Sequence, residues 1–147
     1  MGHQIYFLAL LAVCTLAALA FGGAAERVGA LMLLASVAVS ALVLSPAASR
    51  YTGFEGVMFA VDAAVTAAFL MLSLRTTRFW PLWMTAMLAV ETASHLVGLL
   101  DIQGRAARIV YAILVQVWIY PLCLCLLLGT IRHRMRVARL GADPSWR

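Results

Sequence analysis

Three ionisable side chains interrupt the most apolar parts of this chain: Asp62, Glu91 and His95. A charged group at the centre of a membrane span costs about 2.5–3.5 kcal/mol on insertion scales, so it needs a partner or a role. Glu91 and His95 are four positions apart and therefore share a helix face. A carboxylate so placed can orient an imidazole for proton handling or ligand binding. The same pair also suits a hydrogen bond that only holds helices together.

The elements that carry these residues are long apolar runs separated by short segments rich in arginine. The chain has 147 residues, 65% hydrophobic and 12% charged, against about 25% charged in soluble domains. About 20 helical residues cross a membrane, whereas barrel strands are shorter and alternate in polarity. The sequence therefore predicts an all-α, polytopic transmembrane helical bundle. We place its five spans at about residues 5–21, 28–44, 56–74, 81–100 and 109–131.

The first run raises the question of a cleaved signal peptide. Small residues around Gly22 suit cleavage, but neither Arg nor Lys precedes the run, so the positive region of a signal peptide is missing. We expect the first span to be retained; its cleavage would leave four. Residues 1–131 are then a single transmembrane domain, and residues 132–147 form a basic cytoplasmic tail, helical over 132–139.

The distribution of arginine predicts the orientation. All 11 basic residues are Arg, and five spans leave three of them on the side of the N-terminus: Arg50, Arg105 and Arg108. The other side holds eight: Arg27, Arg75, Arg78, Arg132, Arg134, Arg136, Arg139 and Arg147. Because cytoplasmic loops are enriched in Arg, we expect a bacterial inner-membrane protein with its N-terminus outside and its C-terminus in the cytoplasm. Phe79, Trp80 and Trp83 would then anchor the cytoplasmic interface.

Counting from the outer ends of the spans places several polar side chains at one depth. Asp62, Glu91, His95 and Gln116 fall in a slab roughly 8–14 Å below the outer edge, with Ser40 near the same level. The first four are our candidate ligand-binding or proton-handling residues, and we expect them to approach one another. Glu91 has a possible cation one turn away, whereas Asp62 has none unless His95 reaches it across the bundle.

Metal and catalytic chemistry are less favoured. Asp62, Glu91 and His95 could supply three ligands, but their spacing follows no metal-site pattern. Haem would depend on one embedded histidine. The three cysteines fall in apolar runs without zinc spacing or a disulfide framework: Cys14, Cys123 and Cys125. The sequence predicts no catalytic residue and no metal site, and it leaves any cofactor unknown.

Prolines and small residues shape the predicted spans. Pro81 falls in the first turn of its span, a favoured place, and Pro121 should kink the last span and free a carbonyl near Val117. Trp118 and Tyr120 beside that kink either line a cavity or pack. Alanines give the third span a small-residue face that permits close approach by the same chain or another subunit: Ala60, Ala63, Ala64, Ala67 and Ala68.

Around Asp62, Arg78-Phe79-Trp80-Pro81-Leu82-Trp83 and His95, the chain resembles uncharacterised small multi-span proteins of the bacterial inner membrane. The resemblance covers the last three spans loosely and brings no catalytic motif. We expect a non-enzymatic subunit or accessory factor that assembles with itself or with a larger membrane complex. A proton-coupled transporter and a quinone- or lipid-binding protein are the alternatives. The net charge of +5 sits at membrane boundaries, which indicates lipid headgroups rather than nucleic acid.

Overall fold

The computed structural model describes residues 2–46, 50–100 and 104–146. Its helices are α1 (Gly2–Phe21), α2 (Ala24–Val43), α3 (Gly56–Arg75), α4 (Trp80–Ser94), the 3₁₀ helix η1 (His95–Leu99), α5 (Gly104–Gln116) and α6 (Ile119–Leu140). In these ranges the only other regular feature is an isolated antiparallel bridge between Thr76 and Trp146. The prediction of an all-α fold is confirmed.

Four segments are long and apolar enough to cross a membrane: Ala24–Val43, Gly56–Arg75, Trp80–Leu99 and Gly104–Leu140. The apolar part of α1, Ile5–Phe21, is shorter. These lengths and this composition fit a membrane protein.

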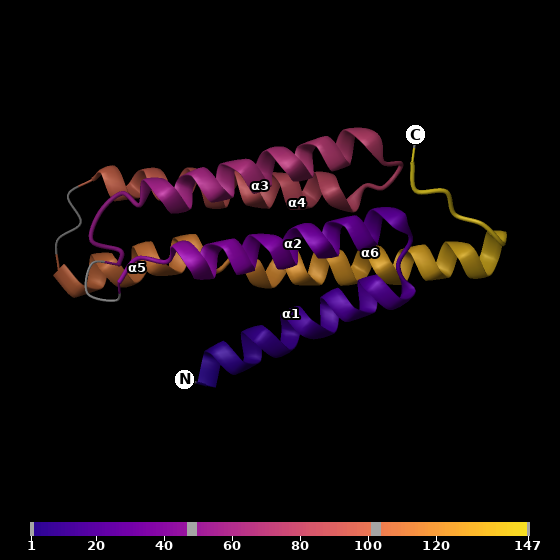
Figure 1. Ribbon diagram of the computed structural model, residues 1–147, viewed down its shortest axis with the longest axis horizontal. Helices are drawn as coiled ribbons and strands as arrows, with labels where there is room; N and C mark the ends of the chain where they lie inside the picture. Colours follow the sequence, from indigo (N-terminus) through magenta and orange to yellow (C-terminus); the bar gives the residue numbers. More distant parts are fainter. Residues whose placement is uncertain (1, 47–49, 101–103, 147) are drawn as a thin grey trace.

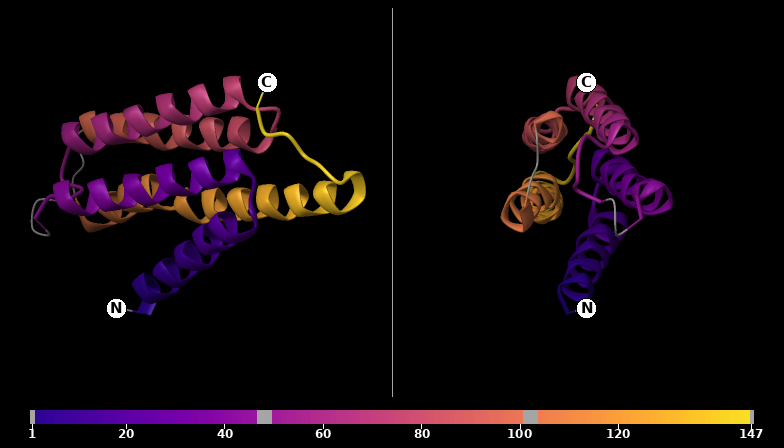
Figure 2. Two further views of the ribbon diagram at one scale, coloured as in Figure 1. Left: turned by 45° about the vertical axis from the view of Figure 1, so that its right-hand side comes forward. Right: turned by 90° about the vertical axis from the view of Figure 1, so that its left-hand side faces the viewer.

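Successive passes of the chain run in opposite directions (Figure 1). The passes α2, α3, α4 with η1, and α5 with α6 lie side by side, whereas α1 tilts away from them toward the N-terminus. In the end-on view of Figure 2, the N-terminal end of α1 lies apart from the other helices. Toward its C-terminal end, α1 packs on α6 and α2. The helix α3 packs on α4 and α2. The N-terminus and the end of α6 therefore lie at opposite ends of the bundle.

The two prolines that fall within the predicted spans, Pro81 and Pro121, occupy first turns of helices. Pro81 begins α4, as predicted, and Pro121 follows the break at Val117 and Trp118 that separates α5 from α6. Because proline lacks an N–H, the Val117 carbonyl accepts from the Tyr120 N–H at 3.4 Å instead. The predicted helix in the basic tail is the end of α6, which continues to Leu140.

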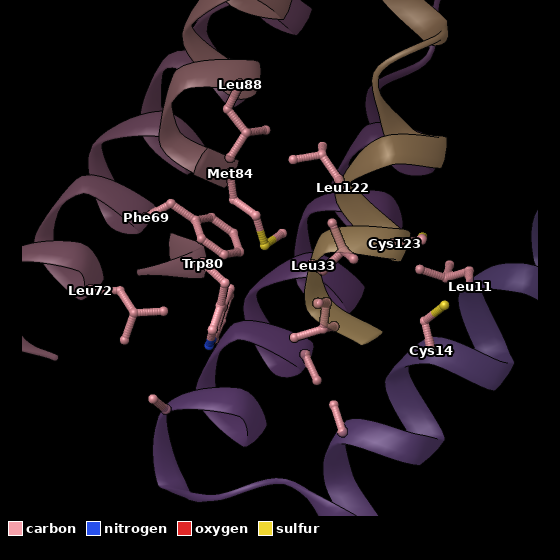
Figure 3. Close-up of a cluster of buried hydrophobic side chains, with 14 residues drawn as sticks. Leu11, Cys14, Leu33, Phe69, Leu72, Trp80, Met84, Leu88, Leu122 and Cys123 are labelled. Atoms are coloured by element: carbon pink, nitrogen blue, oxygen red, sulfur yellow. The ribbon is translucent and has the colours of Figure 1, made fainter. Parts of the chain in front are cut away.

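Trp80 lies in the apolar core where α2, α3, α4 and α6 meet (Figure 3). A Cβ atom at Gly29 would lie 2.4 Å from Trp80 Cη2, and one at Gly129 would lie 2.6 Å from Trp80 Cδ1. The indole is therefore wedged between α2 and α6. The expectation that Trp80 anchors the interface is wrong, since it is only 7% exposed, whereas Phe79 and Trp83 are 62% and 57% exposed.

Candidate functional site: a cavity between the helices

A cavity of about 640 Å³ lies between the helices, toward the end of the bundle where α2 leads into α3. Every helix contributes to its wall, from Phe7 on α1 to Leu122 on α6. Most of the wall is aliphatic, with side chains such as Leu33, Val65 and Ile113. Small-molecule sites have volumes of about 300–1,000 Å³ and apolar walls with a few polar groups, so the cavity has the dimensions of a binding site.

All four candidate residues line this cavity: Asp62 from α3, Glu91 from α4, His95 from η1 and Gln116 from α5. Ser40 of α2, predicted at the same depth, lines it as well. The expected convergence of polar side chains from separate helices is therefore present.

The imidazole of His95 pairs with Asp62 rather than with Glu91. His95 Nε2 lies 2.8 Å from Asp62 Oδ2, and both side chains are largely buried. The predicted pairing along one helix face is wrong because α4 ends at Ser94 and His95 begins the tighter η1 helix. Among the described residues, nothing hydrogen-bonds the buried Nδ1 atom of His95. Because that nitrogen is buried, it is closed to a ligand in the cavity.

The η1 helix is held in place by close packing at Gly98. A Cβ atom there would lie 2.8 Å from both the Phe54 Cα and the Tyr111 hydroxyl oxygen. The Tyr111 hydroxyl also lies 3.4 Å from the His95 carbonyl oxygen and donates to it. Tighter 3₁₀ turns are common at the C-terminal ends of α-helices, and this one sets the His95 ring against α3.

Glu91 has no hydrogen-bond or ion-pair partner within the described parts of the chain. It is half-buried in the cavity wall and close enough to Asp62 for the two carboxyl groups to interact electrostatically. Because Asp62 is occupied by His95, the Glu91 carboxyl is the polar group of this cluster that remains available.

Gln116 belongs to the mouth of the cavity. Its Nε2 donates to the Tyr51 hydroxyl, and the Tyr51 N–H donates in turn to Glu55 Oε1 at 2.9 Å. Tyr51 has a φ of 61°, and its ring meets that of Tyr111 edge to face. Burial raises the pKa of the Tyr51 phenol, so the hydroxyl is neutral near pH 7. Gln116 therefore fixes the loop between α2 and α3.

Of the two aromatic residues beside Pro121, only Tyr120 lines the cavity. The indole N–H of Trp118 donates instead to the Leu114 carbonyl at 2.9 Å. Within the described residues, no group of three or more His, Cys, Asp or Glu side chains is placed to hold a metal ion. The three cysteines are free thiols.

A second polar cluster, which the sequence analysis missed, lies at the opposite end of the bundle. Glu26 on α2 is fully buried. Its Oε1 accepts from Trp80 Nε1 at 3.0 Å and lies 3.5 Å from Arg78 Nε, and its Oε2 accepts from the Gly23 N–H at 3.1 Å. Glu26 follows the N-cap residue Gly23 by three positions, which is the acidic half of a capping box, and this spacing is the sequence signal that could have located it.

The end of the chain closes this cluster. Residues 141–146, here called the C-terminal strap, return from the end of α6 to the turn between α3 and α4 (Figure 1). There the Thr77 N–H donates to the Ser145 carbonyl at 3.1 Å, and Asp143 Oδ1 lies 2.5 Å from Arg78 Nη1. The predicted tail is thus a helix followed by a docked segment. Arg147, counted in that tail, lies outside the described residues.

The Asp143 carboxylate is the centre of the cluster. Its Oδ2 lies 2.8 Å from His133 Nδ1 and 2.9 Å from Arg136 Nε, both on α6. Burial by itself would raise the pKa of Asp143, but hydrogen bonds from Arg78, Arg136 and His133 outweigh it and lower the pKa to about 2. These contacts join α6 and the strap that follows it to Arg78, which is distant in sequence, and this is a structural role.

Comparisons with protein-family models, with curated proteins and with solved structures find no match for this chain. The functional argument therefore depends on the geometry of the cavity.

Proposed function

We propose that this protein binds a small molecule with an apolar body and a polar head in the cavity between its helices. The observation that supports this most directly is the cavity itself, whose volume of about 640 Å³ suits a small molecule. Its aliphatic wall would accommodate the apolar body. Glu91, which has no partner among the described residues, would contact the head.

A cavity-blocking variant tests this function. Ala112 on α5 lines the cavity, and Val110, two residues earlier, is 56% exposed and does not. We expect the purified protein in lipid nanodiscs to bind the neutral probe triphenylphosphine oxide above the level of empty nanodiscs. Ala112→Trp should abolish this binding and Val110→Trp should preserve it. Equal binding by both variants and the native protein would place the probe in the lipid and contradict the proposal.

A role as a non-enzymatic subunit or accessory factor is the second candidate, and it is supported by α3. Three alanines on one side of this helix are exposed and permit close approach by another helix: Ala60, Ala64 and Ala67. The partner is a second copy or a larger complex. Light scattering of the detergent-solubilised protein should give an oligomeric mass that Ala64→Trp reduces. A monomeric native protein would rule out self-assembly.

We place the protein in the bacterial inner membrane with its C-terminus in the cytoplasm. The support is the arginine distribution, eight against three, together with the four long apolar segments. In this orientation the cavity lies in the outer half of the bilayer and the cluster around Asp143 faces the cytoplasm.

A further inference from the structure

The charged side chains that line the cavity are not balanced. They are three carboxylic acids, one guanidinium and one imidazole: Glu55, Asp62, Glu91, Arg50 and His95. Asp62 pairs with His95. Glu55 accepts from the Tyr51 N–H and the Ser45 hydroxyl, while Arg50 donates to the Ser45 carbonyl. Only the Glu91 carboxyl is left without a partner among these described residues.

A carboxylate surrounded by an apolar wall is costly unless a proton or a cation neutralises it. No cationic side chain of the described chain forms an ion pair with Glu91. His95, its nearest basic neighbour in sequence, is held by Asp62 at 2.8 Å. A positive charge on a ligand would therefore find its counter-charge already in the wall.

The cavity is also rich in aromatic rings. Four of them line it, one each from α1, the loop before α3, α5 and α6: Phe7, Tyr51, Tyr111 and Tyr120. Aromatic faces attract cations, most strongly where the contact is desolvated. A cavity that has both aromatic rings and an unpaired carboxyl in its wall can recognise the charge and the apolar substituents of an organic cation.

We infer that the ligand of this cavity is a lipophilic organic cation, with Glu91 as its counter-charge. This inference rests on the proposed binding function and names the ligand class. The aliphatic wall and the aromatic rings contact the substituents of the cation, and Asp62 and His95 remain paired with each other. A proton and the cation compete for the Glu91 carboxylate, because either one neutralises it.

Two probes of similar shape test the charge. Tetraphenylphosphonium is a lipophilic cation, and triphenylphosphine oxide is its neutral counterpart. We expect the native protein in nanodiscs to bind the cation at least about tenfold more tightly than Glu91→Gln does, because losing one partner of a desolvated charge pair costs several kcal/mol. Glu91→Gln should bind the neutral oxide about as well as the native protein. Glu55→Gln, which makes the same change at a carboxylate that already has partners, should bind both probes about as well.

The outcomes separate this inference from the proposed function. Binding of the oxide without the cation, or equal loss of both probes in Glu91→Gln, would overturn the charge assignment and leave cavity binding intact. The same loss of cation affinity in Glu55→Gln would overturn the assignment to Glu91. Binding of neither probe to the native protein would refute both proposals.

If Glu91→Gln does not fold, a pH titration of the native protein tests whether a carboxylate in the cavity is the counter-charge of the cation. Affinity for tetraphenylphosphonium should fall as the pH is lowered through the range in which the Glu91 carboxylate takes up a proton, while affinity for the oxide stays constant. The ionisable groups that face Glu91 across the cavity are Asp62 of α3, His95 of η1, Tyr111 of α5, Tyr120 of α6, and Arg50, Tyr51 and Glu55 in the loop. If protonation of these groups reshaped the cavity, the affinity for both probes would change alike, and that result would overturn the inference.

Discussion

His95 Nε2 of η1 lies 2.8 Å from Asp62 Oδ2 of α3, across the interface between two successive passes of the chain. The imidazole donates from Nε2 to the carboxylate both when the ring is protonated and in the neutral tautomer that carries its proton on Nε2. The pair therefore joins η1 to α3 and sets the position of the cavity wall.

Substitution of Asp62 distinguishes a hydrogen bond from a proton relay. Asp62→Asn keeps an oxygen that accepts from His95 Nε2, so we expect a change below about 1 kcal/mol in stability. Asp62→Leu leaves the buried Nε2 unpaired and should cost about 1–3 kcal/mol. Thermal unfolding of both variants in the same detergent measures the difference. Equal destabilisation of the two variants would show that the negative charge, rather than the hydrogen bond, stabilises the protein. Loss of proton-coupled transport in Asp62→Asn with unchanged stability would establish a relay.

Close packing around Trp80 predicts the effect of an added methyl group. Alanine normally stabilises a helix interior by about 1 kcal/mol relative to glycine. At Gly129, however, its Cβ atom would lie 2.6 Å from Trp80 Cδ1, so Gly129→Ala should lower stability by about 1–3 kcal/mol. Gly56→Ala is the control, because its Cβ atom would lie 3.4 Å from Phe54 Cε1. If the Gly129→Ala variant unfolds at the same temperature as the native protein, or at a higher one, the Trp80 indole can move to make room.

The lowered pKa of Asp143 predicts acid sensitivity at the end of the bundle that the C-terminal strap closes. An aspartate with a pKa of about 2 in the folded protein, against 3.8 ordinarily, stabilises the fold above pH 4 and loses this contribution as the pH falls through about 2. After allowance for solvent screening, we expect Asp143→Asn to cost about 1–2 kcal/mol near pH 7.

Hydrogen–deuterium exchange of the C-terminal strap reports this loss locally. The backbone N–H groups of the strap should exchange faster in Asp143→Asn than in the native protein at the same pH, and in the native protein at about pH 2 they should lose protection relative to their intrinsic exchange rate at that pH. Arg139→Gln, which alters an exposed side chain on the same helix, should leave them unchanged. Unchanged exchange in Asp143→Asn would show that the backbone contacts at Thr77 hold the strap without the carboxylate.

The arginine distribution predicts the topology. A fluorescent reporter that folds only in the cytoplasm, fused to the C-terminus, should be active, whereas a periplasmic reporter there should be inactive. The reverse result would invert the orientation. The cavity would then open toward the cytoplasmic half of the membrane.

The sequence predicts the helices well because their signals are local. Apolar runs of span length, Pro81 in a first turn and Pro121 near the break between α5 and α6 all act within a few residues. The change from α4 to η1 was missed because it depends on Gly98 packing against Phe54, a contact distant in sequence. For the same reason the partner of His95 was misassigned.

The polar residues at the ends of the spans were misinterpreted for a different reason. Arg78 and Trp80 have the composition of an interface segment, where arginine and tryptophan usually face lipid headgroups. Here both are buried, and Glu26 of α2 contacts both side chains. Asp143 is an acidic residue in a basic tail, and its role appears only when the strap is folded back.

The ion pair between Arg78 and Asp143 has a consequence for how the chain is assembled during synthesis. The two residues are 65 positions apart, and two passes of the chain separate them. Both lie at one end of the bundle because α4 with η1 runs away from that end and α5 with α6 returns to it (Figure 1). A chain with one of these passes missing or inverted would leave the two charges at opposite ends. The strap can therefore close only on a chain whose passes are all in place, after the last helix has been synthesised.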